Sequence, residues 1–94
     1  MRILAVDDDP IILELLTQFV AAIGEHELTT AESGAEALDI LKTPGCAPFE
    51  CFMLDIQMPQ MDGVELLTRI RDIARYADTP VLMVTAMSDT RYID

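Results

Sequence analysis

The chain has few basic residues. Six Lys and Arg face 17 Asp and Glu among its 94 residues, which gives a formal net charge of −11. Nucleic acids and anionic membrane surfaces are bound largely through Lys and Arg, which neutralise phosphate and lipid charge. The composition therefore excludes both as partners of this segment.

Cysteines and long apolar runs are also scarce. Cys46 and Cys51 are too few for a disulfide scaffold and have no His or Cys at zinc-binding spacing, so we expect reduced thiols. No run of about 18 apolar residues is present to span a membrane. The acidic residue Asp7 comes too early for a secretory signal peptide. We expect a cytoplasmic protein without a membrane anchor.

Hydrophobic residues are abundant, at 51% of the chain, which is too many for a disordered segment of this charge. The length fits one domain at most, since domains usually contain about 100–150 residues. We expect a single folded domain over residues 1–94.

Short apolar runs alternate with longer stretches of helical periodicity. We expect strands at 3–6, 27–31, 51–54 and 81–84, helices at 10–23, 34–42 and 62–74, and a fourth helix starting near 88. All strands except the second are almost entirely apolar, which is typical of a parallel sheet with both faces covered. The second is more polar and reads as an edge strand. This order indicates an α/β fold.

Helix boundaries have recognisable sequence signals. Asp9 followed by Pro10 predicts a helix start, and Gly24 predicts its end. Ser33 with Glu36, and Asp62 with Glu65, match capping boxes. We assign the first helix an apolar face of Ile12, Leu15, Leu16, Phe19, Val20 and Ile23, and the third one of Val64, Leu67, Ile70, Ile73 and Ala74.

Polar side chains follow three of the predicted strands. Asp7 and Asp8 follow the first, Asp55 the third and Thr85 the fourth. The carboxyl ends of parallel strands meet at one edge of a sheet, where ligands bind. Crowded carboxylates repel one another unless a cation is present, and an all-oxygen ligand set suits Mg²⁺. A carboxylate beside Mg²⁺ can accept a phosphoryl group, so we expect a Mg²⁺-dependent phosphoryl site.

Three motifs together resemble the receiver domain of two-component response regulators. They are the residues at 6–10 (VDDDP), at 53–63 (MLDIQMPQMDG) and at 84–86 (VTA), in the family's order and spacing. The resemblance implies a flavodoxin-like (CheY-like), doubly wound fold with strand order 2-1-3-4 for the strands present. It also implies a phosphoacceptor switch module, not an enzyme with a diffusing substrate.

The resemblance also assigns roles to individual residues. Asp55 would accept the phosphoryl group from a histidine kinase or phosphotransfer protein. Asp7, Asp8, Asp55 and the backbone carbonyl of Gln57 would hold Mg²⁺, and Asp8 would be the direct ligand of the acidic pair. The Thr85 hydroxyl would sense the phosphoryl group.

The family continues beyond the length of this chain. Its members have a complete fourth helix, then a fifth strand followed by an essential Lys, and a fifth helix. By comparison, we expect a domain shortened at its C-terminus, with any output domain beyond Asp94. We also expect a homodimer or domain-swapped assembly, because the Val81–Val84 strand and the first helix would lose their covering elements.

Two other functions remain open. Without the Lys, the segment could be an inert or pseudo-receiver interaction module. A haloacid-dehalogenase-type phosphatase is a weaker alternative, because that family places a second Asp two residues after its nucleophile, where this chain has Gln57. For other residues we favour structural roles: Asp9 and Asp62 as helix caps, Met58 and Met61 in loop packing, and His26 as an exposed side chain.

Overall fold

A four-stranded parallel sheet forms the centre of the molecule. The computed structural model describes residues 1–84, and the strands are β1 (Arg2–Val6), β2 (Glu27–Ala31), β3 (Cys51–Asp55) and β4 (Val81–Val84). They lie in the order β2-β1-β3-β4, each parallel to its neighbour. This confirms the α/β CheY-like fold and the predicted strand order. The carboxyl ends of β1 and β3 lie side by side, because Val6 pairs with Leu54.

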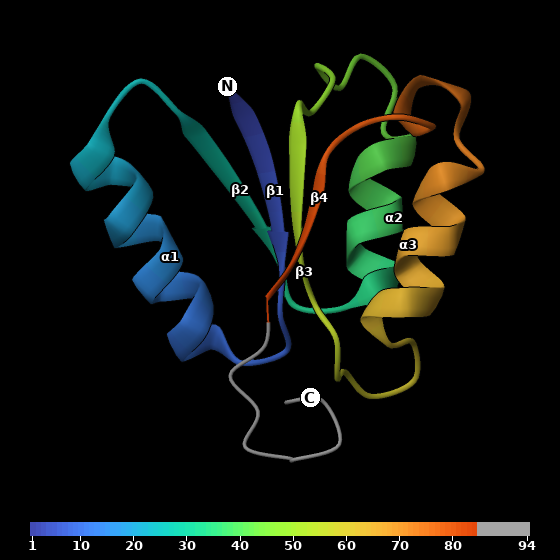
Figure 1. Ribbon diagram of the computed structural model, residues 1–94, viewed down its shortest axis with the longest axis horizontal. Helices are drawn as coiled ribbons and strands as arrows, with labels where there is room; N and C mark the ends of the chain where they lie inside the picture. Colours follow the sequence, from blue (N-terminus) through green and yellow to red (C-terminus); the bar gives the residue numbers. More distant parts are fainter. Residues whose placement is uncertain (85–94) are drawn as a thin grey trace.

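Helices cover both faces of this sheet. Figure 1 shows α1 (Pro10–Ile23) on one side, and α2 (Gly34–Lys42) and α3 (Gly63–Arg71) on the other. A short 3₁₀ helix, η1 (Ala74–Tyr76), follows α3. The third helix ends three residues earlier than predicted: residues 72 and 73 lie between α3 and η1, and Ala74 begins η1.

The predicted helix caps form. The side chains of Asp9, Ser33 and Asp62 accept backbone N–H bonds from Ile11, Glu36 and Glu65, respectively. In a capping box the Glu36 carboxylate would accept the N–H of Ser33. Here it accepts the N–H of the preceding residue, Glu32. Propensity and capping thus define where each helix begins, as expected from the sequence.

The main core lies between the sheet and the α2–α3 layer. It contains Leu4, Val6, Ala31, Ala37, Leu38, Phe49, Phe52, Leu54, Met58, Leu66, Ile70 and Tyr76. Our assignment of the helix faces was partly wrong. In α3 the buried residues are Gly63, Leu66 and Ile70, whereas Val64 is 58% exposed. Helix α1 buries Leu13 and Val20 and leaves most of its other large apolar side chains exposed.

Strand β4 lies at the edge of the sheet that residues 1–84 form, next to β3. Its apolar run is typical of a strand covered on both faces, but we also expected it to be an exposed edge. Leu82 and Met83 are 55% and 36% exposed, in agreement with the second expectation. The apolar sequence of a strand shows that its side chains can be buried. The position of the strand in the sheet decides whether they are buried.

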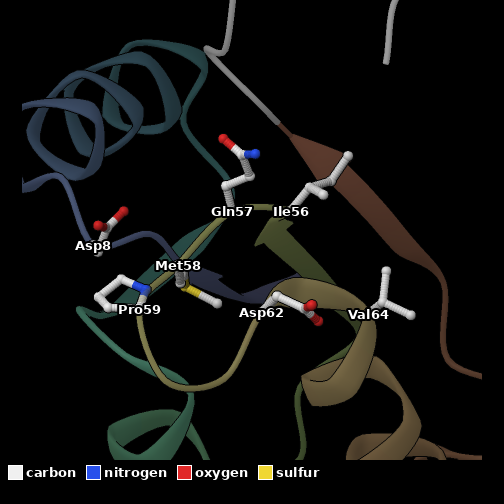
Figure 2. Close-up of a pocket in the computed structure, with 7 residues that line it drawn as sticks. All are labelled: Asp8, Ile56, Gln57, Met58, Pro59, Asp62 and Val64. Carbon is white, nitrogen blue, oxygen red and sulfur yellow. The ribbon is translucent and has the colours of Figure 1, made fainter. Parts of the chain in front are cut away.

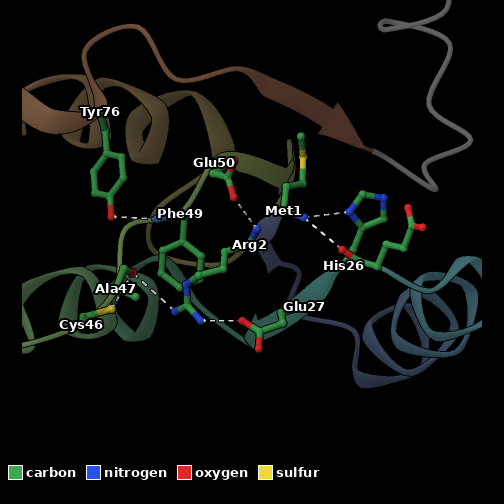
Figure 3. A network of polar contacts seen from close by, with 10 residues as sticks. Met1, Arg2, His26, Glu27, Cys46, Ala47, Phe49, Glu50 and Tyr76 are labelled. Carbon is green, nitrogen blue, oxygen red and sulfur yellow. Dashed lines mark hydrogen bonds and ion pairs between the residues drawn. The ribbon is translucent and has the colours of Figure 1, made fainter.

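A polar network holds the edge of the sheet where the strands begin (Figure 3). The Arg2 guanidinium donates to Glu27 at 3.0 Å and to the Ala47 carbonyl at 3.4 Å, and lies 4.9 Å from the Phe49 ring centroid. The buried Tyr76 hydroxyl accepts the N–H of Phe49 at 3.3 Å. This network ties β1 to β2 and to the segment before β3.

Features predicted at 85–94, including the fourth helix, lie outside the described residues. Cys46 and Cys51 are free thiols. In the described part of the chain, no helix is long and apolar enough to cross a membrane.

Candidate functional site

Three carboxylates meet at the carboxyl ends of β1 and β3. Asp7, Asp8 and Asp55 each offer a ligand oxygen, and these oxygens all lie within 4.8 Å of one another. Asp7 and Asp55 are only 5% and 8% exposed, whereas Asp8 is exposed to solvent. The topology produces this cluster, because β1 and β3 are adjacent and parallel although they lie far apart in the sequence.

Backbone N–H groups orient the two buried carboxylates. Asp7 Oδ1 accepts the N–H of Asp9 at 2.9 Å, just before α1 begins. Asp55 Oδ1 accepts the N–H of Gln57 at 3.3 Å, in the turn after β3. Each bond spans two residues, so the chain leaving a strand turns around the carboxylate that ends it. Both side chains are therefore held in the site.

Burial and the neighbouring negative charges raise the pKa values of Asp7 and Asp55. Burial raises the pKa of Asp55 to about 6, and the charges of Asp7 and Asp8 add to the effect while the Gln57 N–H opposes it. Burial also raises the pKa of Asp7, with a further contribution from Asp8 and an opposing one from the Asp9 N–H. A cation near these oxygens would lower both pKa values.

A hollow lies beside Asp8, one of the three carboxylates (Figure 2). Its lining residues come from the loop between β1 and α1, the loop after β3 and the start of α3; they are Asp8, Ile56, Gln57, Met58, Pro59, Asp62 and Val64. One carboxylate of the cluster, Asp8, thus faces a space that a small phosphorylated group or ion can enter. Asp62 lines the same hollow, but its carboxylate caps α3, as expected.

The start of α3 packs unusually close to the end of β3. The Gly63 N–H donates to the Ile56 carbonyl at 2.9 Å, and a Cβ on Gly63 would overlap the backbone carbonyl oxygen of Asp55. Only a residue without a side chain allows this approach. The sequence indicates only a helix start at the Asp-Gly pair and does not predict this contact with the site. Gly34 also directly follows an N-cap, but a Cβ there would meet the Met61 side chain and not a strand backbone.

The remaining predicted site residues have different outcomes. Gln57 lines the hollow, in the turn directly after Asp55. Thr85 lies outside the described residues. Met58 is buried in the core, and Met61 packs against it, in agreement with their predicted packing roles. His26 is exposed and its Nδ1 lies 3.0 Å from the N-terminal amine (Figure 3). It precedes β2, whereas the acids follow the carboxyl ends of β1 and β3.

Comparison with known proteins identifies the family. A model of the response regulator receiver domain matches residues 3–94. The chain belongs to this family.

Individual receivers share both sequence and fold with the chain. A chemotaxis protein CheY homolog of Campylobacter jejuni is 32% identical over 85 residues, covering 90% of this chain and 64% of that protein. The structure of Vibrio cholerae CheY4 has a TM-score of 0.83 at 32% identity, covering 96% of this chain and 72% of that one. Thermotoga maritima TrrA, solved in complex with Mg²⁺-BeF, has a TM-score of 0.76 at 39% identity, covering 96% and 73%.

A receiver domain is a signalling switch module of two-component systems, not a classical enzyme. The acidic cluster of this receiver is consistent with a phosphoacceptor site and is typical of the Mg²⁺ sites of its family. The chain spans less than two thirds of the curated relatives it matches, from 9% of the histidine kinase BarA of Escherichia coli to 64% of the CheY homolog.

Proposed function

We propose that this receiver accepts a phosphoryl group on Asp55 from the phosphohistidine of a sensor histidine kinase or phosphotransfer protein. The observation that carries the proposal is the meeting of three carboxylate oxygens within 4.8 Å, beside an open hollow. A purely structural role does not explain two buried acids whose pKa values are both raised. Such a cost in stability is typical of functional sites.

Asp55 is the proposed nucleophile. Its carboxylate oxygen forms a bond to phosphorus while the phosphorus–nitrogen bond of the phosphohistidine breaks, and the departing imidazole nitrogen takes up a proton. The acceptor must be ionised to attack, and at neutral pH most Asp55 carboxyls are ionised, because their pKa is about 6. The N–H of Gln57 holds one carboxylate oxygen, which leaves the other to react.

The donor set fits Mg²⁺, because all of its atoms are oxygens and two carboxylates are buried next to a third that is open to solvent. We assign Asp8 as a direct ligand, Asp7 as a ligand acting through water, and the Asp55 carboxylate and the Gln57 backbone carbonyl as further ligands. When bound, the ion supplies positive charge that neutralises the carboxylates and the incoming phosphoryl oxygens.

The switching role belongs to the chain after β4. The Thr85 hydroxyl is the proposed sensor of the phosphoryl group, since it follows β4, which pairs with the strand that ends at Asp55. A changed surface would then alter binding to a partner or to an output domain beyond Asp94. A kinase donor of this kind places the domain in the cytoplasm.

The test is phosphorylation by a small phosphodonor such as acetyl phosphate in the presence of Mg²⁺. We expect one phosphoryl group per chain, labile to hydroxylamine and absent from Asp55→Asn. Asp39→Asn is the matched control, because it removes an exposed carboxylate on α2 and should leave labelling unchanged.

Three results would contradict the proposal. Absence of label in a folded chain would indicate an inert interaction module. Label that persists in Asp55→Asn would place the acceptor elsewhere. Rapid, steady release of phosphate would indicate a phosphatase.

Metal binding provides a separate prediction. Asp8→Asn should weaken Mg²⁺ binding by at least about tenfold, because it removes a direct ligand, whereas Asp9→Asn should change it by less than about threefold. Both variants lose one negative charge at adjacent positions, and Asn replaces Asp well as an N-cap. Isothermal titration with MgCl₂ measures both affinities. Equal losses would show that the site attracts Mg²⁺ only through its overall charge.

A further inference from the structure

A strained turn lies in the loop that follows β3. Among residues 1–84, two that are not glycine have a positive φ, Glu25 and Gln60, each at 70°. This left-handed region is unfavourable for a residue with a side chain, because its Cβ comes close to the following carbonyl oxygen. Glu25 lies between α1 and β2, whereas Gln60 lies between Asp55 and the start of α3. Strained backbone persists only where the surrounding structure holds it, and it is concentrated at functional sites.

The turn at Gln60 is closed by a backbone hydrogen bond. The Met61 N–H donates to the Pro59 carbonyl at 2.8 Å. This bond spans three residues, which defines a γ-turn, and the positive φ at its centre makes it the rare and strained form. Figure 2 shows the loop passing from Gln57 and Pro59 to Asp62 at the start of α3. The direction in which the loop returns to α3 is therefore set at Gln60.

Both ends of this loop are held by other contacts. At its start, the Gln57 N–H donates to Asp55 Oδ1 at 3.3 Å, and the Met58 side chain is buried in the core. At its end, the Gly63 N–H donates to the Ile56 carbonyl at 2.9 Å, and the Gly63 backbone packs against the carbonyl of Asp55. A loop fixed at both ends can change its turn only by moving the residues between them. These residues include the one that carries the Gln57 carbonyl.

The Gln60 side chain lies apart from the carboxylates. It is exposed to solvent and, with Pro59 and Met61, lines a small hollow at the first residues of α2. Asp8 and Gln57 line a different hollow. An effect of Gln60 on the carboxylate site must therefore pass through the backbone, which makes Gln60 a positioning residue and not a ligand.

We propose that Gln60 positions the Gln57 carbonyl for Mg²⁺ by holding this strained turn. The role rests on the proposed function, because it takes the Gln57 carbonyl as a ligand of the ion. If residue 60 leaves the left-handed region, the hydrogen bond between Met61 and Pro59 is lost. Since the ends of the loop are fixed, residues 57–59 must then shift. The Gln57 carbonyl turns with them, whereas the acids that follow β1 stay in place.

Replacement by a β-branched residue tests the proposal, because such side chains are strongly disfavoured at positive φ. Gln60→Val should weaken Mg²⁺ binding by about tenfold in calorimetric titration with MgCl₂, the usual loss when a group that orients a metal ligand is removed. Gln60→Asn should bind Mg²⁺ within about twofold of wild type, because asparagine tolerates the left-handed region. Asparagine is thus the conservative replacement that keeps the turn.

Glu25 provides the matched control, because it has the same φ in a turn between α1 and β2. Comparing Glu25→Val with Glu25→Gln repeats the change from glutamine to valine without a difference in charge. Valine should lower the Tm in EDTA by roughly 5–10 °C at both positions, since the added strain is similar. At position 25 the Mg²⁺ affinity should stay unchanged. Titrations are made well below the lowest Tm, so that every variant is folded.

Three results would overturn the proposal. Unchanged Mg²⁺ affinity in Gln60→Val would show that the turn does not position the ligand. Equal losses of affinity in Gln60→Val and Glu25→Val would show that the loss follows from lower stability alone. Weakened binding in Gln60→Asn would show that the glutamine side chain acts on the site, and not the turn. Failure of the folded wild-type chain to bind Mg²⁺ would contradict the proposed metal site itself, which distinguishes the two proposals.

Discussion

Gly63→Ala should destabilise the domain by about 3 kcal/mol, which corresponds to a fall in Tm of roughly 10–20 °C for a domain of this size. The new Cβ would overlap the Asp55 carbonyl oxygen and would lie 2.9 Å from the Asp55 carbonyl carbon and 3.0 Å from Met83 Cε. Backbone atoms cannot rotate away as a side chain can. The start of α3 or the end of β3 must therefore move.

The same displacement should reach the carboxylate site. Gly63 N–H bonds to the carbonyl of Ile56, the residue between the two proposed ligands Asp55 and Gln57. Moving this turn changes where the Gln57 carbonyl points, so Mg²⁺ affinity should fall together with stability. Urea unfolding followed by circular dichroism measures the first effect, and calorimetric titration with MgCl₂ measures the second.

Gly34→Ala is the matched control. Gly34 is also the first residue of a helix after its N-cap, but a Cβ there would meet the Met61 side chain, at 2.6 Å from its Sδ. A flexible thioether can move, so we expect a cost below about 1 kcal/mol and unchanged Mg²⁺ binding. If Gly63→Ala and Gly34→Ala lose equal stability, the close approach of Gly63 to the Asp55 backbone is not the cause of the loss.

Asp55→Asn should stabilise the metal-free domain at pH 7. In the folded state the pKa of Asp55 is about 6, against an ordinary value of 3.8. The folded chain therefore binds more protons than the unfolded chain between these two values, and its free energy of unfolding falls as pH rises through that window. At pH 7 this cost is fully present, and at roughly 1.4 kcal/mol per pH unit it amounts to about 3 kcal/mol.

The asparagine variant removes that cost. It keeps the size of the side chain and an oxygen that can accept the Gln57 N–H, but it has no charge to desolvate. The difference in unfolding free energy between variant and wild type should thus be small near pH 4 and should grow up to pH 7. Urea unfolding in EDTA at several pH values measures this difference.

Added Mg²⁺ should reverse the order. Mg²⁺ binds the folded state and therefore stabilises it. This stabilisation should be larger in the wild type than in Asp55→Asn, because the variant lacks one charged ligand. Asp39→Asn, on an exposed part of α2, should match wild type at every pH. A pH-independent difference between Asp55→Asn and wild type would mean that charge burial at Asp55 does not limit stability.

Much of the fold could be predicted from local sequence. The caps at Asp9, Ser33 and Asp62 and the apolar runs of the strands define the helix starts and strand positions within one or two residues, because these signals act over a few residues of chain. The acidic residues at strand ends indicated the site for a similar reason. Once the strands are parallel, their carboxyl ends share an edge.

Burial could not be predicted in the same way. Phe19 and Leu15 have the spacing of a helix core face, yet both are exposed, whereas Leu13 and Leu66 are buried and were missed. Tyr76 has no local signal of its role, but in the fold its ring packs against Phe52 and its hydroxyl bonds to Phe49. An amphipathic pattern shows which side chains can be buried, and only the arrangement of layers shows which ones are.

The sequence by itself determined the strand and helix order, the helix caps and the identity of the acidic residues, because each of these depends on neighbours along the chain. Tertiary structure alone decided two further features: the raised pKa of Asp55 and the contact of Gly63 with the Asp55 backbone. Each arises where segments distant in sequence approach one another. At such places desolvation and steric overlap act through space.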